Sequence, residues 1–252
     1  WVGRLVSIIC SLFSLKLTTK LLGIDNYSIY LILSNVVAWA VLCDFGLGYS
    51  LQNYITELRS KGEDYKRHIL LTVFLLILVL ILFTIIIWFF SPFLSRILFN
   101  KIFIGKTYII ESAFFISFFI GLLTALGSIS TKIYYGLQNG HIPNILISLG
   151  SILNIFGLYF ISYFNLVSIT NVILITFGIN AVISIFPLTY FIFISNPKLF
   201  SFDKKIIIQI LNDKLLLGLL TFSSCKVIGV SLITWASFMF SSFFVVLSIF
   251  FY

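Results

Sequence analysis

Arg4 and Asp44 carry opposite charges inside strongly apolar stretches, and they are the residues best suited to chemistry in this chain. A charged side chain at the centre of a membrane span costs about 2.5 to 3.5 kcal/mol on insertion scales, so it normally has a partner or contacts water. The hydrophobic pattern places both residues at similar depth on consecutive antiparallel helices. We therefore expect their side chains to pair or to share water. Such a pair either fastens the first helical hairpin or forms a gate in which Asp44 takes up a proton.

Small and polar residues also repeat at intervals of three and four along four apolar stretches, which puts them on one face of each helix. The four faces contain Gly3, Ser7, Ser11, Ser14 and Thr18; Ser117, Gly121, Thr124, Ala125, Ser128 and Thr131; Gly150, Asn154 and Gly157; and Thr176, Asn180, Ser184 and Pro187. One explanation is packing, because small residues let helix backbones approach and polar side chains bond across the interface. The other is a hydrated cavity between the helices. Its candidate substrate-binding residues are Arg4, Ser11, Asn154 and Asn180.

The elements that position these residues follow from composition. Hydrophobic residues make up 60% of the 252 residues and charged residues only 10%, and the mean hydropathy is +1.15. A soluble fold must cover its outside with polar groups, and a helix of about 20 apolar residues crosses a bilayer. We predict an all-α, polytopic membrane bundle with six complete transmembrane helices and one or two further hydrophobic segments at its C-terminal end. The predicted helices span residues 2–19, 27–51, 69–90, 108–131, 143–164 and 172–194, and a seventh segment spans 215–235.

Lysine and arginine are unequally distributed between the predicted loops. Placing residues 57–68 in the cytoplasm puts nine of these cations on that side and four outside, as the positive-inside rule requires. The nine are Arg59, Lys61, Lys66, Arg67, Lys132, Lys198, Lys204, Lys205 and Lys214, and the four are Lys20, Arg96, Lys101 and Lys106. This topology and attraction to anionic lipid headgroups explain the formal charge of +8. We predict the lipid bilayer as a partner and no nucleic acid.

Cysteine and histidine offer little chemistry. Cys10, Cys43 and Cys225 lie in apolar stretches, where a thiol behaves as a small hydrophobic group. No spacing indicates a zinc site or a disulfide framework, and no phosphate-binding glycine loop, HExxH or GxSxG motif occurs. We therefore predict that the chain is not an enzyme and has no cofactor or metal site.

Both ends of the sequence are unusual. It begins with Trp1, and its single methionine is Met239, so we expect the true N-terminus to be missing. Residues 215–252 have Lys226 as their only charge and lack a visible loop, which predicts a truncation or a change of reading frame. We accordingly divide the chain into a six-helix lobe, residues 1–214, and an incomplete start of a second lobe, residues 215–252.

Three short segments resemble the O-antigen flippases of bacteria, in the polysaccharide-transport branch of the multidrug/oligosaccharidyl-lipid/polysaccharide exporter superfamily. They are Leu-Gly-Ile-Asp-Asn-Tyr-Ser at 22–28, Asp-Phe-Gly-Leu-Gly at 44–48 followed by Asn53, and Tyr-Tyr-Gly-Leu-Gln at 134–138, which resembles a cytoplasmic turn of that family. The resemblance covers residues 1–214, as the first of two six-helix lobes with a MATE-like fold. Ser28 departs from it, because the family commonly has glycine there.

The resemblance implies a function. Members of the family move an undecaprenyl-pyrophosphate-linked oligosaccharide from the cytoplasmic to the periplasmic leaflet of the inner membrane by alternating access between two lobes. It implies a lipid-linked oligosaccharide as cargo, a polysaccharide polymerase and a chain-length protein as partners, and a truncated copy if the second lobe is absent. Arginine binds phosphate bidentately, so Arg4 is the candidate for the pyrophosphate and Asp44 the candidate for coupling to an ion gradient.

Two alternatives remain open. An integral-membrane O-antigen polymerase or glycosyltransferase would also be polytopic and rich in aromatic residues. Such an enzyme needs acids for acid–base work in a sizeable external loop, and the longest predicted one, residues 91–107, contains no carboxylate. The other alternative is a different exporter of the same superfamily.

Overall fold

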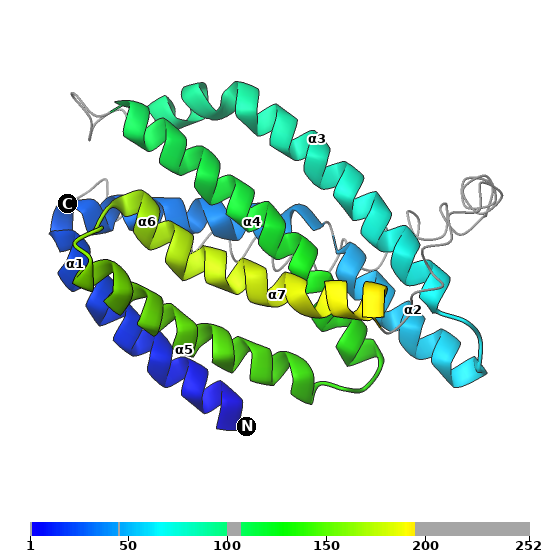
Figure 1. Cartoon of the computed structure of the whole chain (residues 1–252). Coiled ribbons are helices and arrows are strands. Elements are labelled where there is room, and N and C mark those ends of the chain that lie inside the picture. The colour runs from blue at the N-terminus through cyan, green and yellow to red at the C-terminus, as the bar shows by residue number, and fades with distance from the viewer. Residues whose placement is uncertain (1, 45, 100–106, 195–252) are drawn as a thin grey trace.

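The computed structural model describes residues 2–44, 46–99 and 107–194, and every element in these ranges is helical. The predicted segment 215–235, the predicted second domain and Lys226 lie outside the described residues. The elements are α1 (Val2–Val41), η1 (Leu42–Asp44), α2 (Leu47–Lys61), α3 (Lys66–Phe99), α4 (Thr107–Gly136), α5 (His141–Tyr163), α6 (Ile169–Ile173), η2 (Leu174–Gly178), α7 (Ile179–Thr189) and η3 (Tyr190–Ile194). Elements α6 to η3 follow one another without a loop (Figure 1).

Helix α1 consists of two helices joined at Gly23. The backbone of Gly23 has φ 71° and ψ 171°, a conformation that is essentially restricted to glycine. The chain reverses its direction across the bundle at this point (Figure 1). Residues 2–22 and 24–41 are each about 30 Å long at 1.5 Å per residue, which matches a bilayer core. These halves correspond to the first two predicted spans.

Five described helical stretches are long and apolar enough to cross a membrane. They span Gly3–Asp44, His68–Phe99, Ile110–Gly136, His141–Tyr163 and Ile169–Ile192. The all-α membrane fold is therefore confirmed. The predicted number of six crossings depends on Gly23 dividing the first stretch into two, and it stays a prediction together with the MATE-like lobe.

The predicted second span, residues 27–51, is wrong at its C-terminal end. The helix stops at Asp44, and Gly46 adopts a left-handed conformation with φ 78° before α2 begins at Leu47. Helix α2 is amphipathic: it buries Leu51, Ile55 and Leu58 against its neighbours, and its charged residues are exposed. The apolar run in the sequence hid this break, because Leu47 and Leu51 are apolar without belonging to the membrane span.

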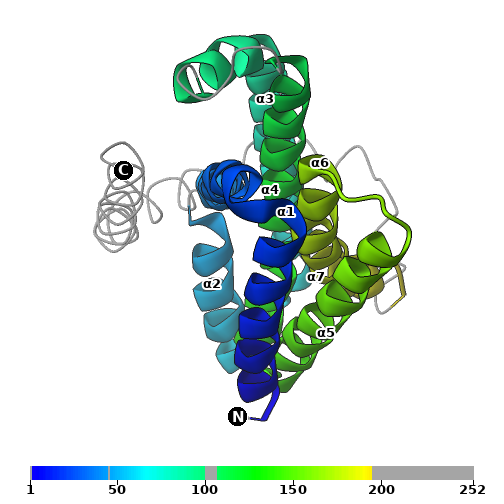
Figure 2. The same cartoon turned by 90° about the vertical axis from the view of Figure 1, so that its left-hand side faces the viewer.

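Helix α4 is the centre of the bundle and contacts α1, α2, α3 and α7 (Figures 1 and 2). Its glycines allow close crossings. A Cβ atom on Gly121 would lie 2.5 Å from the Cβ of Ala40 and 2.6 Å from the carbonyl oxygen of Val37. Such distances are far below van der Waals contact, so packing explains the glycine in the polar face of the fourth predicted span.

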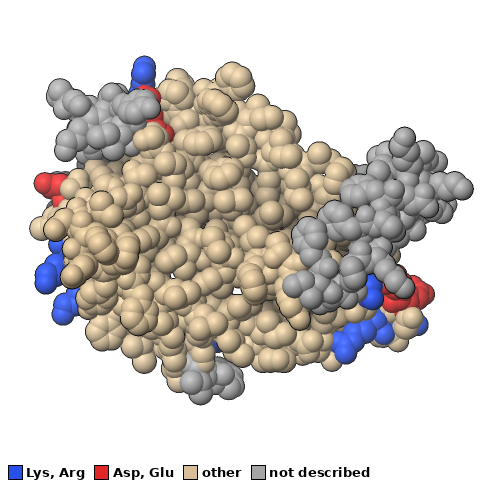
Figure 3. All heavy atoms as spheres, in the orientation of Figure 1, with Lys and Arg blue, Asp and Glu red and all other residues tan. Residues whose placement is uncertain are grey.

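The outer surface is apolar and suits lipid. On α3, Trp88 is 72% exposed and Phe89 79% exposed, far more than a soluble protein normally leaves for its largest apolar side chains. On the face seen in Figure 3, charged side chains gather toward the two ends of the bundle and leave a broad uncharged band between them. At one end, Arg96 on α3 pairs with Glu111 on α4 at 3.4 Å. The surface is that of a membrane protein.

The predicted cytoplasmic turn at residues 134–138 is a turn in the structure. Helix α4 ends at Gly136, and Gln138 adopts a left-handed conformation with φ 59°. The N–H of Gln138 donates to the carbonyl oxygen of Tyr135 at 3.0 Å, and the N–H of Asn139 donates to that of Tyr134 at 2.8 Å. This pair of bonds is the Schellman motif that closes helix C-termini.

Candidate functional site

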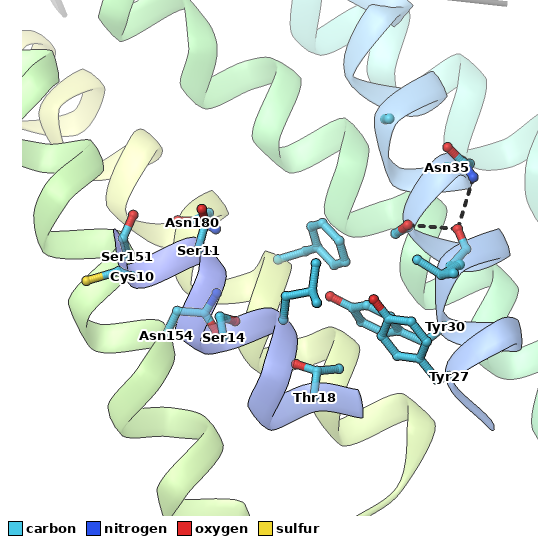
Figure 4. A pocket seen from close by; sticks show the side chains of 15 residues that line it. Cys10, Ser11, Ser14, Thr18, Tyr27, Tyr30, Asn35, Ser151, Asn154 and Asn180 are labelled. Carbon is cyan, nitrogen blue, oxygen red and sulfur yellow. Dashed lines mark hydrogen bonds between the residues drawn. The ribbon is translucent and has the colours of Figure 1, made fainter. Parts of the chain in front are cut away.

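A cavity of about 450 Å³ opens between the two halves of α1, helix α5 and the continuous helix that contains η2 and α7 (Figure 4). Its size falls in the range of about 300 to 1,000 Å³ that is usual for small-ligand sites. The lining residues are Cys10, Ser11, Ser14, Leu15, Thr18, Tyr27, Tyr30, Leu31, Ser34, Asn35, Ala38, Ser151, Asn154, Phe177 and Asn180. None of these side chains carries a formal charge. The cavity offers hydroxyls, amides and aromatic rings.

Three of the four predicted cavity residues meet here. Ser11 lies on the first half of α1, Asn154 on α5 and Asn180 on α7 (Figure 4). They come from three of the polar faces found in the sequence, which the fold turns toward one space. The amide groups of Asn35 and Asn180 each donate to a carbonyl oxygen one turn earlier, at 3.1 and 2.8 Å.

Arg4 lies elsewhere. It is exposed, and its Nε donates a hydrogen bond of 3.4 Å to the Oδ1 of Asn144 at the start of α5. It lines neither of the cavities described here. The nearby backbones cross closely, because the hydroxyl of Ser148 donates to the carbonyl oxygen of Gly3 at 2.8 Å. Arg4 therefore sits where the first turns of α1 and α5 meet.

The expected pairing of Arg4 with Asp44 is wrong. Asp44 accepts a hydrogen bond of 3.1 Å from the N–H of Gly46, and the cation that acts on it electrostatically is Lys132 of α4. The ammonium group of Lys132 lies 3.3 Å from the ring centroid of Tyr49 on α2. Equal depth in the membrane does not decide on which side of a helix a residue lies, so the sequence could not exclude this arrangement. Asp44 belongs to the junction of α1, α2 and α4.

Most lining residues were not among the predicted candidates, and four of these stand out because three are aromatic and one is an amide. The rings of Tyr27 and Tyr30 stack with centroids 5.8 Å apart, and those of Tyr30 and Phe177 stack at 6.1 Å. The fourth is Asn35. A search for helical spacing in the second half of α1 could have found Tyr27, Tyr30 and Ser34 on one face.

The segment η2 brings Phe177 and Asn180 to the cavity. It is a turn of π-helix, with hydrogen bonds that span one residue more than in an α-helix. Such turns are rare and occur frequently at functional sites. Upstream, the side chain of Ser168 accepts a hydrogen bond from the N–H of Asn171 and starts the helix. The π-turn shifts the register of the residues that follow it.

A second cavity of about 370 Å³ adjoins the first and shares Ser151 and Asn180 with it. Its other walls include Thr124, Ser128 and Thr131, which belong to the polar face of α4. These residues lie in the C-terminal half of α4, whereas Ser14 and Thr18 of the first cavity lie near the opposite end of the bundle under the predicted topology. The two cavities together follow the length of the bundle.

Comparison with known proteins gives relatives of one kind. The chain is 35% identical over 155 residues to a Yersinia pseudotuberculosis protein that is provisionally named as an O-antigen export protein. This match covers 62% of this chain and 36% of the relative. Two proteins provisionally named as O-antigen transporters also match. The one from Salmonella typhimurium is 28% identical and covers 65% of this chain and 38% of the relative. The one from Salmonella typhi is 27% identical, and the match covers 77% of this chain and 44% of the relative.

The chain thus spans less than half the length of these relatives. No family model matches it, and no solved structure matches it. The relatives are named as transport proteins and not as enzymes. Their names agree with the resemblance carried by the motifs at residues 22–28, 44–48 and 134–138. The similarities confirm that resemblance: this chain is similar in sequence to proteins that are provisionally named for O-antigen export and transport.

Proposed function

We propose that the chain takes part in moving an O-antigen or other polysaccharide repeat unit across the bacterial inner membrane. The cargo in this proposal is linked to undecaprenyl pyrophosphate, and it crosses by alternating access between this lobe and a second one. The observation that carries the proposal is the uncharged polar cavity inside an apolar bundle. Polar groups within a membrane are expensive and face a bundle interior or a water-filled path when they serve transport.

The distribution of polar groups supports a route along the bundle. The two cavities adjoin at Ser151 and Asn180, and hydroxyl or amide side chains line both. A sugar carries many hydroxyls and loses its hydration when it enters hydrocarbon, so each wall hydroxyl offsets part of that loss. Lipid-facing residues such as Trp88 keep the outer surface compatible with acyl chains.

Arg4 and Asp44 have separate roles in this proposal. Arg4 is exposed beside Asn144 at the end of α1 that the charge distribution assigns to the cytoplasm, where it meets the pyrophosphate of an arriving lipid. Asp44 lies next to Lys132 at the α1–α2 junction and links an ion gradient to the movement of α2 against α4. A polysaccharide polymerase and a chain-length protein receive the exported units.

The polymerase alternative has less support. Acid–base chemistry at a sugar needs carboxyl groups close to it. None of the described residues that line the two cavities is an acid. The described residues also contain no cluster of His, Cys, Asp and Glu that could hold a metal ion.

Deletion of the gene in its native host tests the proposal and separates it from the alternative. Loss of a transporter leaves lipid-linked units inside the cell, so we expect surface polysaccharide to disappear and these units to accumulate in the membrane. Loss of a polymerase would instead leave single repeat units on surface lipopolysaccharide. That outcome, or unchanged surface polysaccharide, would contradict the proposal. Re-expression of the native gene is the control.

A further inference from the structure

Asn180 on α7 lines both cavities, and Ser151 on α5 is the other residue that they share. The two residues lie close to the midpoints of their membrane spans. Figure 4 shows both of them at the end of the first cavity that is remote from Tyr27 and Tyr30. The cavities therefore meet near the middle of the bundle.

The two cavities extend from this junction toward opposite ends of the bundle. The first reaches Thr18 and Tyr27, which lie on either side of the reversal at Gly23. The second reaches Tyr134 and Pro143, which lie on either side of the turn between α4 and α5. A route through both cavities would thus cross most of the thickness of the lobe.

Both cavities have the size and the polarity that water requires. Their volumes are about 450 and 370 Å³, and none of their lining residues carries a formal charge. Among the described residues, the hydroxyl of Ser14 in the first cavity and that of Thr131 in the second bond to no other group. A polar cavity of this size takes up water, whereas apolar cavities stay dry. We therefore expect water on both sides of the junction.

The side chain of Asn180 closes the junction between α7 and α5. Its Nδ2 donates a hydrogen bond of 2.8 Å to the carbonyl oxygen of Thr176, which holds the amide in place. Its Oδ1 reaches the backbone of α5, because a Cβ atom on Gly150 would lie only 2.7 Å from it. The glycine leaves the space that this amide fills, so the amide bridges the gap between the two helices. An asparagine amide does not titrate, so it separates the water on its two sides without relaying a proton.

We propose that the two cavities are the halves of one water route through the lobe, and that the side chain of Asn180 is the barrier that keeps them apart. The ligand of this site is water, so the inference goes beyond the proposed function and does not depend on it. A closed barrier suits a lobe in an energised membrane, because a continuous file of water molecules would carry protons across and dissipate the gradient.

The test measures the water permeability of proteoliposomes that contain the purified full chain, from the rate at which they shrink in hyperosmotic sucrose. Asn180→Ala removes the amide and opens the junction. After the permeability of protein-free liposomes is subtracted, we expect the permeability per protein to rise about tenfold or more, which corresponds to a barrier lower by about 1.4 kcal/mol.

Two further variants serve as controls. Asn180→Leu keeps the approximate volume of the side chain and blocks the junction with an apolar group, so its permeability stays at the native value. Asn171→Ala is the matched control, because Asn171 lies on the same continuous helix and lines neither cavity. Its permeability also stays at the native value.

Cys10 shows whether the added water passes through the first cavity, which it lines. Mercuric chloride binds the thiol and obstructs the cavity, so it returns Asn180→Ala to the native permeability. The double variant of Asn180→Ala and Cys10→Ser keeps its raised permeability in mercuric chloride. Cys43 lines neither cavity and is present in both proteins.

A measurement on the native chain keeps the proposal testable if Asn180→Ala fails to fold by circular dichroism. Hydroxyl radicals that X-rays produce from bound water label the side chains beside that water. We expect labelling of Tyr27 in the first cavity and of Tyr134 in the second. Phe114 is 3% exposed and lines neither cavity, so it should remain unlabelled.

Several outcomes overturn the inference. They are native permeability in a folded Asn180→Ala protein, equal opening by Asn180→Leu or Asn171→Ala, no effect of mercuric chloride or one that survives Cys10→Ser, and absence of label on Tyr27 or Tyr134. A native chain as permeable as Asn180→Ala would show that no barrier exists. None of these measurements uses the cargo, so they are distinguishable from a failure of the proposed function, which the deletion phenotype tests.

Discussion

Lys132 of α4 lies over the ring of Tyr49 on α2, with 3.3 Å between its ammonium nitrogen and the ring centroid. A cation over an aromatic face contributes about 0.5 to 1 kcal/mol at exposed sites and more where water is excluded. Tyr49 is 56% exposed, so the lower range applies. The same lysine acts on Asp44. The junction of α1, α2 and α4 is thus held by one cation with two partners.

A double-mutant cycle of Lys132→Met and Tyr49→Leu measures this contact. We expect a coupling free energy of about 0.5 to 1 kcal/mol from unfolding in mixed micelles of increasing dodecyl sulfate content. A parallel cycle of Lys132→Met with Tyr159→Leu, an exposed tyrosine on α5, is the control and should give additive effects. Additivity in both cycles would show that the Lys132–Tyr49 contact contributes nothing.

Helical periodicity made part of the cavity predictable. Ser11, Asn154 and Asn180 lie on the polar faces of three helices, and such faces avoid lipid wherever the helices pack. The spacing of residues alone therefore selected them. The ring of Phe177 was not predictable in the same way, because an aromatic residue in an apolar helix suits lipid as well as it suits a cavity.

The errors have a common physical origin. Hydropathy reports whether a residue is apolar, and it does not report the backbone angles that end a helix. Leu47 and Leu51 therefore continued the second span in the sequence, although Gly46 separates them from it with a positive φ. Hydropathy also predicts how deep a residue lies in the membrane, but not on which side of its helix the side chain lies. The predicted pairing of Arg4 with Asp44 was wrong for this reason.

Gly23→Ala should destabilise the fold through the backbone alone. A Cβ atom at Gly23 meets nothing within 4 Å, so no clash contributes, but φ 71° with ψ 171° is unfavourable for alanine. We expect a loss of about 1 to 3 kcal/mol in the same unfolding assay.

Gly178→Ala is the matched control, because its Cβ also meets nothing within 4 Å and its φ is −64°. Alanine at Gly178 should be neutral or stabilising by up to about 1 kcal/mol. Equal effects at both positions would contradict the proposed reversal at Gly23.

Gly121→Ala should destabilise for a different reason. The new methyl group would lie 2.5 Å from the Cβ of Ala40, so α1 and α4 must separate. Overpacking of this kind costs about 1 to 3 kcal/mol. The sign is diagnostic, because alanine normally stabilises a helix relative to glycine by about 1 kcal/mol. A stabilised Gly121→Ala protein in thermal unfolding would show that the two helices are not in close contact there.

Gln138→Gly should stabilise the turn between α4 and α5. Gln138 holds a left-handed conformation, which costs an ordinary residue about 1 to 2 kcal/mol, and its side chain is exposed. After the entropy cost of glycine is subtracted, a gain of about 0.5 to 1 kcal/mol remains. The same change at Gln52, inside α2, should cost about 1 kcal/mol. Thermal midpoints that fall for both variants would contradict this assignment of the turn.

Arg4→Gln tests whether this arginine binds the anionic part of the cargo. Its side chain is exposed and makes one hydrogen bond of 3.4 Å to Asn144, so the substitution should leave stability unchanged. A charge-assisted hydrogen bond to phosphate contributes about 1.5 to 3 kcal/mol, which corresponds to a loss of about tenfold or more in cargo affinity. We expect surface polysaccharide in the native host to fall accordingly, and Arg4→Lys to retain part of it, because lysine keeps the charge but not the bidentate geometry.

Arg96→Gln is the control: Arg96 is also exposed, but it pairs with Glu111 at the opposite end of the bundle under the predicted topology. An equal fall for Arg96→Gln would indicate a general effect of surface charge, because under the proposed function Arg4, and not Arg96, lies at the end where the lipid-linked unit enters.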